Sequence, residues 1–258
     1  MRPTWTGSIG FGLVNIPVKM YVATEESTIS FSQLHKDDNA KIRYKKINEN
    51  TGKEVKQEEI VRAFKYGSEY VIIDDEDFKK AAPEKYDHLE IRQFVNEKEI
   101  DAVYFEKHYY LEPDKSGAKA YALLRDALKK EGKAALGPLI YHNKEWVCLV
   151  KPLRNILVMH RLRFSDEIRS EEELTIPNAP VKPEEIKMAS ALIAQLTKPF
   201  NPEEYKDEYS EKLMKVIEAK AGGKESNVKT MKVVHSTTID LMAQLKASLD
   251  KSSTRKAS

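Results

Sequence analysis

Apolar side chains alternate with polar ones from Trp5 to Met20, but the alternation changes parity halfway. They occupy odd positions up to Leu13 and even positions after it. Successive side chains of a strand point to opposite faces, so a change of parity indicates a bulge or a change of face. Gly10 and Gly12 come just before the change, where a strand can bend sharply. The pattern predicts one long, bent strand in a sheet that curls toward a barrel.

Short alternating or apolar runs predict further strands as far as residue 164. They cover residues 30–35, 41–47, 70–73, 89–95, 102–111, 137–142, 146–150 and 155–164. Within this β-rich part, apolar residues at helical spacing predict two helices, over 75–82 and 117–131. We expect 70–73 to be a buried strand. A turn-rich centre predicts that 41–57 forms a hairpin with one basic face.

The composition changes at a proline-rich connector over 175–183, and helical spacing prevails after it. One amphipathic helix is expected over 186–196, a second from an N-cap at Asn201, and a third over 239–249. Three prolines within seven residues make the connector stiff, so these helices need a surface on which to bury their apolar stripes. A second subunit would supply that surface. The alternative is that the helices fold back on the chain's own barrel.

Composition limits the class of protein. The 258 residues allow one large domain or two small ones, with 41% hydrophobic and 33% charged residues. The chain has no apolar run long enough to span a membrane, and its single cysteine excludes an intramolecular disulfide framework. We therefore expect a soluble cytoplasmic protein. The net charge is only +2, but residues 220–258 carry eight basic and three acidic residues, which fits either a functional basic end or a solvated tail.

Most candidate catalytic patterns have a simpler structural explanation. Gly7, Gly10 and Gly12 lack the spacing of a phosphate-binding loop and lie inside a strand pattern. The six histidines are scattered, and neither H-E-x-x-H nor C-x-x-C occurs, so we expect no metal and no cofactor. Cys148 lies in an apolar strand, where thiols are usually inert.

An acidic run from Asp74 to Asp77 keeps one enzyme class open. Metal-dependent nucleases hold Mg²⁺ with carboxylates near strand ends, and Glu54-Val55-Lys56 adds an E-x-K tripeptide. The same run also suits the N-terminus of the helix over 75–82, where negative charge is favourable. A metal-dependent nuclease on a β-barrel scaffold is therefore the alternative function. A protein-interaction scaffold with no role on DNA is a third hypothesis.

Six segments, in a fixed order, carry a family resemblance. They are W-x-G-S-I-x-F-G-L-V-x-I-P-V-K at 5–19, F-x-x-L-H-K at 31–36, I-R-Y-K-K at 42–46, E-I-V-R-A-F-K-Y at 59–66, Y-Y-L-E-P-D at 109–114 and A-Y-A-L-L-R-D-A-L at 120–128. Together they resemble the prokaryotic Ku proteins, the DNA-end-binding factors of non-homologous end joining. Ala63 and Lys65 replace the usual Gly and Glu of the fourth segment, which is a local departure.

The resemblance implies an α+β, mainly β fold: a Ku-core β-barrel with a helical arm and C-terminal helices, in a ring-forming homodimer. It assigns 1–176 to the barrel with DNA-encircling hairpins, 177–221 to a helical dimerisation arm and 222–258 to a basic C-terminal segment. The ring would thread onto double-stranded DNA ends near the nucleoid, without enzymatic activity. The segment after Gly222 would recruit the multifunctional bacterial DNA ligase, although the longer lysine-rich tail of many members is not seen here.

Candidate site residues follow from the matched motifs. A ring that accepts any sequence should contact phosphates through Lys and Arg. The expected DNA-binding residues are Lys19, Lys36, Lys41, Arg43, Lys45 and Lys46, followed by Lys129, Lys130 and Lys133 at the end of the 117–131 helix. For each one, a solvated surface side chain is the alternative. The expected dimer contacts are Ile186, Ile193 and Leu196.

Overall fold

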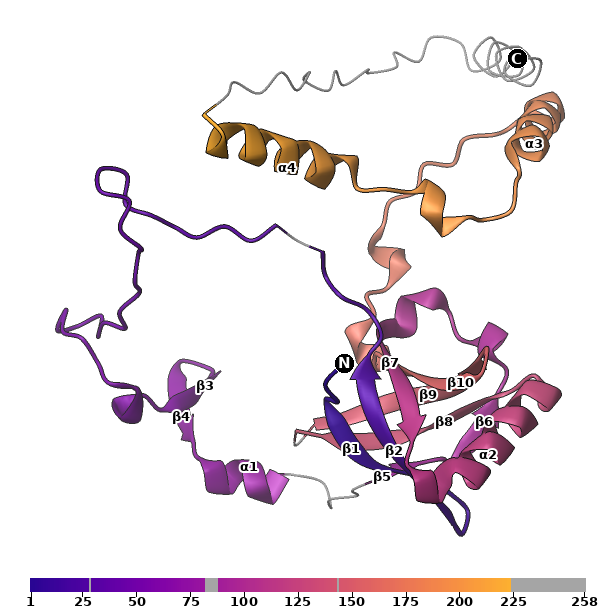
Figure 1. Ribbon diagram of the computed structural model, residues 1–258, viewed down its shortest axis with the longest axis horizontal. Helices are drawn as coiled ribbons and strands as arrows, with labels where there is room; N and C mark the ends of the chain where they lie inside the picture. The colour runs from indigo at the N-terminus through magenta and orange to yellow at the C-terminus, as the bar shows by residue number, and fades with distance from the viewer. Residues whose placement is uncertain (28, 82–87, 143, 224–258) are drawn as a thin grey trace. The chain divides into compact units, whose positions relative to one another are not determined.

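The structure is a computed structural model that describes residues 1–27, 29–81, 88–142 and 144–223. It divides into two compact units, Met1–Glu171 and Glu172–Ser258 (Figure 1). The first unit contains the sheet and the second contains the helices that follow the proline-rich connector. Among the described residues, no helix is long and apolar enough to cross a membrane.

The opening segment is a β-hairpin rather than one bent strand. β1 (Trp5–Phe11) and β2 (Val14–Val22) pair antiparallel, with Gly12 and Leu13 between them. Gly12 has φ of 58°, a left-handed conformation that glycine adopts without strain. The expectation of a single strand was therefore wrong. The parity changes because the register pairs odd residues of β1 with even residues of β2, which keeps one face of the hairpin apolar.

Eight strands form one sheet in the order β5-β1-β2-β7-β10-β9-β8-β6. The remaining six strands are β5 (His88–Glu90), β6 (Gln93–Val95), β7 (Phe105–Pro113), β8 (Ala134–Tyr141), β9 (Lys144–Leu153) and β10 (Ile156–Leu162). β5 pairs parallel to β1, and the other pairs are antiparallel. The expected strand over 89–95 is thus two short strands, and the strand expected from residue 102 begins at Phe105.

A short segment joins the two edges of this sheet. β5 and β6 stand at opposite ends of the strand order, but only Ile91 and Arg92 separate them in the chain. The Ile91 N–H donates to the Gly10 carbonyl, and the Arg92 N–H donates to the Leu136 carbonyl, both at 2.9 Å. Residues 88–95 therefore bond to β1 on one side and to β8 on the other, which closes the curled sheet into a barrel.

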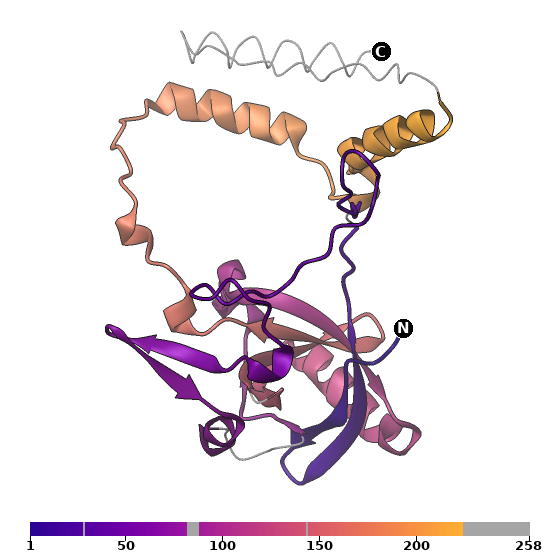
Figure 2. The same ribbon diagram turned by 90° about the vertical axis from the view of Figure 1, so that its left-hand side faces the viewer.

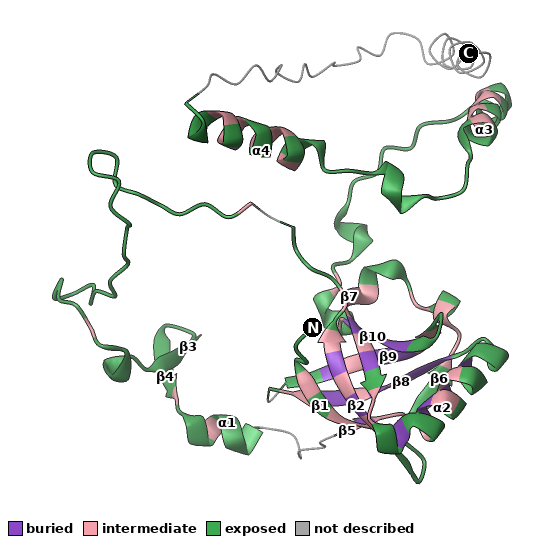
Figure 3. Cartoon of the chain, viewed as in Figure 1, coloured by how far each residue is buried: buried purple, intermediate pink, exposed green. Residues whose placement is uncertain are grey.

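The core of this unit combines strand residues with one helix. α2 (Ala118–Glu131) buries Tyr121, Leu124 and Leu128 in the same apolar cluster as the inward residues of β1, β2, β7 and β9 (Figure 3). Gly132, at φ of 61°, ends the helix in the left-handed conformation, as its sequence predicts. The expected helix over 117–131 is confirmed.

We call residues 23–81 the arm, a segment distinct from the helical dimerisation arm expected over 177–221. Where the structure describes it, the arm contains no buried residue. It includes the 3₁₀ turn η1 (Gln57–Glu59), the hairpin of β3 (Arg62–Tyr66) and β4 (Glu69–Ile73), and helix α1 (Asp75–Ala81); Figure 2 shows the hairpin in purple. The strand expected over 70–73 is present, but Tyr70 is 71% exposed, so its expected burial was wrong. The strands expected over 30–35 and 41–47 are reduced to the isolated bridges Leu34–Lys41 and Ile47–Glu54.

Short 3₁₀ turns connect the remaining elements. They are η2 (Glu97–Glu99), η3 (Ala102–Tyr104), η4 (Lys115–Gly117), η5 (Ser165–Glu167), η6 (Glu171–Glu173) and η7 (Pro202–Glu204). The second unit contains α3 (Pro183–Leu196) and α4 (Glu208–Ala221). Asn201 caps only η7, whereas Asp207 caps α4, so the second C-terminal helix begins later than expected. The helix expected over 239–249 lies outside the described residues.

Candidate nucleic-acid interface

The most concentrated positive charge lies in the arm, at Lys41, Arg43, Lys45 and Lys46, which we call the basic strip. These residues place four cations within six positions that contain no acidic residue. All four side chains are exposed. Polyanion binding needs accessible cations whose charge is not cancelled locally, so the local ion pairs of the strip decide its capacity.

Two loops of the same geometry border the basic strip. In the first, the His35 N–H donates to the Ala40 carbonyl at 2.8 Å and Asn39 has φ of 56°. In the second, thirteen residues later, the Asn48 N–H donates to the Lys53 carbonyl at 2.9 Å and Gly52 has φ of 66°. The turn expected around Gly52 is confirmed, and each loop fixes one end of the strip without a hydrophobic core.

Only part of the basic strip is neutralised locally. Lys45 forms an ion pair of 2.6 Å with Glu54, and Lys46 donates a hydrogen bond to the neutral side chain of Gln57. Within the described parts of the chain, neither Lys41 nor Arg43 lies within 4.0 Å of a carboxylate oxygen. The strip therefore keeps most of its positive charge available to a ligand.

The other predicted DNA contacts fall elsewhere in the first unit. Lys36 is exposed in the first loop, and half-buried Lys19 on β2 lies 3.5 Å from Asp114. Lys129 and Lys130 occupy the last turn of α2, with Lys133 just after Gly132, and all three are exposed. Cations at a helix C-terminus also interact favourably with the helix dipole, so these lysines have a structural role in addition to any contact with DNA.

The acidic run serves a helix end. The Asp74 carboxylate accepts the N–H groups of Glu76 and Asp77, each at 2.9 Å, which is the geometry of an N-cap for α1. Asp75 pairs with Arg62 at 2.9 Å. Across the described residues, no group of three His, Cys, Asp or Glu side chains is placed to hold a metal ion. The hydrogen bonds explain the acidic run as a cap of α1, and nothing among the described residues favours the nuclease alternative.

Cys148 is fully buried in β9, and burial raises the pKa of its thiol. A raised pKa keeps the sulfur protonated and unreactive at neutral pH. The placement agrees with the sequence-based interpretation of Cys148 as a core residue.

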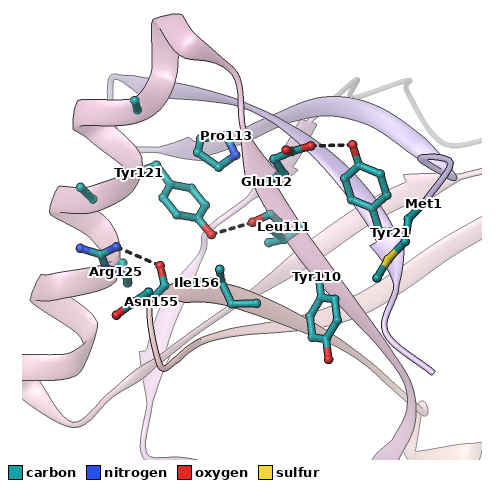
Figure 4. Close-up of a pocket in the computed structure, with 12 residues that line it drawn as sticks. Met1, Tyr21, Tyr110, Leu111, Glu112, Pro113, Tyr121, Arg125, Asn155 and Ile156 are labelled. Carbon is teal, nitrogen blue, oxygen red and sulfur yellow. Dashed lines mark hydrogen bonds between the residues drawn. The ribbon is translucent and has the colours of Figure 1, made fainter.

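A cavity of about 660 Å³ lies between α2, β7 and the β9–β10 turn (Figure 4). Its walls include Tyr21, Tyr110 and Tyr121, with Glu112 and Arg125 among its polar groups. The Tyr21 hydroxyl donates to the Glu112 carboxylate at 2.5 Å, which raises the pKa of Tyr21. Sequence reasoning missed this cavity because its residues come from elements that only the tertiary fold brings together.

The predicted dimer residues share one exposed face of α3. Ile186, Ile193 and Leu196 are 55%, 66% and 62% exposed, respectively, and α3 buries no residue (Figure 3). At about 100° of rotation per residue, the three side chains lie within one sector of the helix. Within the described part of the second unit, nothing covers this apolar stripe.

Comparisons with known proteins agree with the sequence motifs. The family described as the Ku70/Ku80 beta-barrel domain matches residues 10–188. The chain is 38% identical over 265 residues to the non-homologous end joining protein Ku of Coxiella burnetii, covering 99% of this chain and 97% of that protein. Identity is 43% over 230 residues to the protein of the same name from Archaeoglobus fulgidus, with 87% and 90% covered. The chain is 38% identical over 258 residues to the protein of the same name from Bacillus subtilis, covering 97% of this chain and 82% of that protein. The chain therefore belongs to the Ku family of non-homologous end joining proteins.

Proposed function

We propose that this protein binds the ends of double-stranded DNA, independently of sequence, by threading them through a homodimeric ring in double-strand break repair. The basic strip is the observation that carries the proposal. Four exposed cations, three of them without a carboxylate partner in the described chain, suit phosphate oxygens rather than base edges. The similar proteins of Coxiella, Archaeoglobus and Bacillus are all named for non-homologous end joining.

A ring would reconcile DNA binding with the small net charge of +2. Free ends would be selected because only an end can thread, so overall positive charge would not need to supply the specificity. Cations would then be required only where the ring lines the duplex. The arm suits such a lining, because none of its described residues is buried and it carries the basic strip.

A homodimer is favoured by apolar surface that each unit of the chain leaves uncovered by itself. Besides the α3 stripe, hairpin β3–β4 exposes Phe64 by 65% and Tyr66 by 75%. A two-stranded hairpin is marginally stable by itself, and exposed aromatic and aliphatic faces favour association with another surface. We assign α3 and its neighbours over 177–221 to the contact with a second copy.

The same proposal includes a partner for the C-terminal end. Residues 222–258, which are basic and lie almost wholly outside the described chain, would recruit the multifunctional bacterial DNA ligase. The protein would thus act as a non-enzymatic clamp at the nucleoid and leave strand joining to the ligase. Deletion of residues 224–258 should abolish ligase stimulation and leave binding to linear DNA intact.

The test compares linear duplex with a covalently closed circle of the same sequence, under competition at several salt concentrations. We expect tight binding to the linear form, little to the circle, and a steep loss of affinity with salt because phosphate contacts release counterions. Equal affinity for both topologies would refute the ring. Cleavage of the circle that requires Mg²⁺ and is lost on changing Asp74 and Asp77 would instead support the nuclease.

A further inference from the structure

The hydroxyl of Tyr121 bonds to two strands at once, and Figure 4 shows the first of these bonds, to Leu111. It donates to the Leu111 carbonyl on β7 and accepts the Leu157 N–H on β10, each at 2.6 Å. Leu111 and Leu157 are register partners and form the last pair of the β7–β10 ladder. Tyr121 is only 4% exposed, and burial raises its pKa, which keeps the phenol protonated as the donor. One side chain of α2 therefore ties the helix to the end of a ladder.

Arg125, one turn further along α2, makes a second polar attachment. One terminal nitrogen of its guanidinium donates to the Asn155 carbonyl in the β9–β10 turn at 2.9 Å. Its other donors, at 2.8 and 3.1 Å from the two Asp126 carboxylate oxygens, hold the guanidinium in plane. Two side chains of α2, four positions apart, thus form hydrogen bonds to neighbouring backbone groups at the start of β10.

These hydrogen bonds fix the rotation of α2 about its own axis, which apolar packing alone does not determine. Leu124 and Leu128 bury α2 in the core, but hydrophobic attraction is non-directional and tolerates small rotations of a helix about its axis. Hydrogen bonds weaken steeply when their angles change. The hydrogen bonds of Tyr121 and Arg125 therefore determine the orientation of the next turn of α2. That turn carries Lys129 and Lys130, and Lys133 follows the C-cap.

We propose that Tyr121 and Arg125 are positioning residues for DNA, which orient the lysines at the C-terminal end of α2 toward phosphates. The inference rests on the proposed DNA-binding function and assigns a role within it to two side chains that touch no ligand. It requires that the two anchors and the three lysines act as one unit. Energies of residues that act as a unit are not additive.

The experiment is a double-mutant cycle on the full chain. One arm is Tyr121→Phe, which removes the hydroxyl and keeps the ring in the core. The other arm changes Lys129, Lys130 and Lys133 to Gln. We expect Tyr121→Phe to weaken binding to linear duplex about fivefold in the natural background and to have no effect in the triple-Gln background. Hydrogen exchange of the Leu157 amide should become faster in both backgrounds, because that N–H loses its acceptor.

Two further variants complete the design. Arg125→Lys keeps the charge but loses the planar fork, and it should show the same dependence on the three lysines. It also serves as the test if Tyr121→Phe fails to fold. Tyr110→Phe is the matched control: its hydroxyl has no hydrogen-bond partner within the described chain, although its ring lines the same cavity.

The outcomes separate this inference from the proposed function. If the natural protein fails to bind linear DNA, the proposed function fails and the positioning role falls with it. If the natural protein binds linear DNA, either of two results overturns the positioning role alone. Tyr121→Phe and Arg125→Lys weaken binding equally with and without the three lysines, or they do not weaken it at all. Weakening confined to the background that retains the three lysines supports it.

Discussion

The Nδ1 atoms of His108 and His160 lie 2.7 Å apart, across the pair of strands β7 and β10. One of the two nitrogens must carry the proton for a hydrogen bond to form. The Nε2 atom of His160 is buried and has no partner in the described chain. Because a buried N–H without an acceptor is rarer than an acceptor without a donor, we assign the His160 proton to Nδ1. His160 then donates to His108.

This pair should make stability depend on pH. Burial, followed by Lys151 and His108, lowers the pKa of His160 from 6.5 to about 4, although Glu97 opposes the shift. His160 is protonated below about pH 6.5 in the unfolded chain, but only below about pH 4 in the folded chain. Stability should therefore fall as the pH drops from 6.5 toward 4, by about 2 kcal/mol once partial exposure of the ring is allowed for.

Urea unfolding between pH 7 and 4.5 measures this dependence. His160→Asn removes the titrating group and should flatten the pH dependence of stability. The same change at exposed His142, whose φ of 49° suits asparagine, should leave that dependence unchanged. An unchanged slope in His160→Asn would contradict the assignment.

Gly137 controls closure of the barrel. A Cβ at this position would lie 1.7 Å from the Glu90 carbonyl oxygen, in the segment that joins the two sheet edges. Gly137→Ala must push that backbone away, and we expect a loss of about 3 kcal/mol in the free energy of unfolding. Gly52→Ala is the control, because its Cβ would meet nothing within 4 Å and only its φ of 66° is unfavourable, at about 1 kcal/mol. Similar losses at both positions in urea unfolding would refute the steric explanation.

Local patterns predicted elements better than they predicted what those elements contact. Helix α2 follows from its apolar spacing and Gly132, both of which are local. The parity change near Gly12 fits a bulge as well as a two-residue turn, because each shifts the alternation by one position, and Gly-Leu is not the Asn-Gly pair that marks a hairpin. The sequence alone therefore could not choose between them.

Burial and tertiary hydrogen bonds lie beyond such patterns. The apolar run at 70–73 predicts a strand, yet its burial depends on a surface that the described chain does not supply. The basic strip could be found because its charges are adjacent in sequence. Tyr121 matched a family motif, but its two bonds depend on the register of β7 against β10, which no local pattern encodes.

The basic strip should set the salt dependence of DNA binding. Changing Lys41, Arg43, Lys45 and Lys46 to Gln removes up to four phosphate contacts. The slope of log affinity against log salt should fall by about 3 to 4, since each contact contributes about 0.9. A matched control changes four other exposed lysines, Lys79, Lys98, Lys206 and Lys215, to Gln. Fluorescence anisotropy on a linear duplex measures both, and an equal drop in the two variants would show that only net charge matters.

The exposed face of α3 should hold the dimer together. Ile193→Asp with Leu196→Asp places two carboxylates on a stripe whose natural side chains are 66% and 62% exposed in one chain. If a second copy covers this stripe, burying both charges without partners costs far more than the contact contributes, and the protein should sediment as a monomer of 29.6 kDa. The proposed threading needs a closed ring, so the same variant should also lose its preference for linear DNA over circles. Ala191→Asp adds one carboxylate on the opposite side of α3 and should sediment at the dimer mass. If the double variant still sediments as a dimer, the interface does not lie on α3, and hairpin β3–β4 becomes the next surface to test.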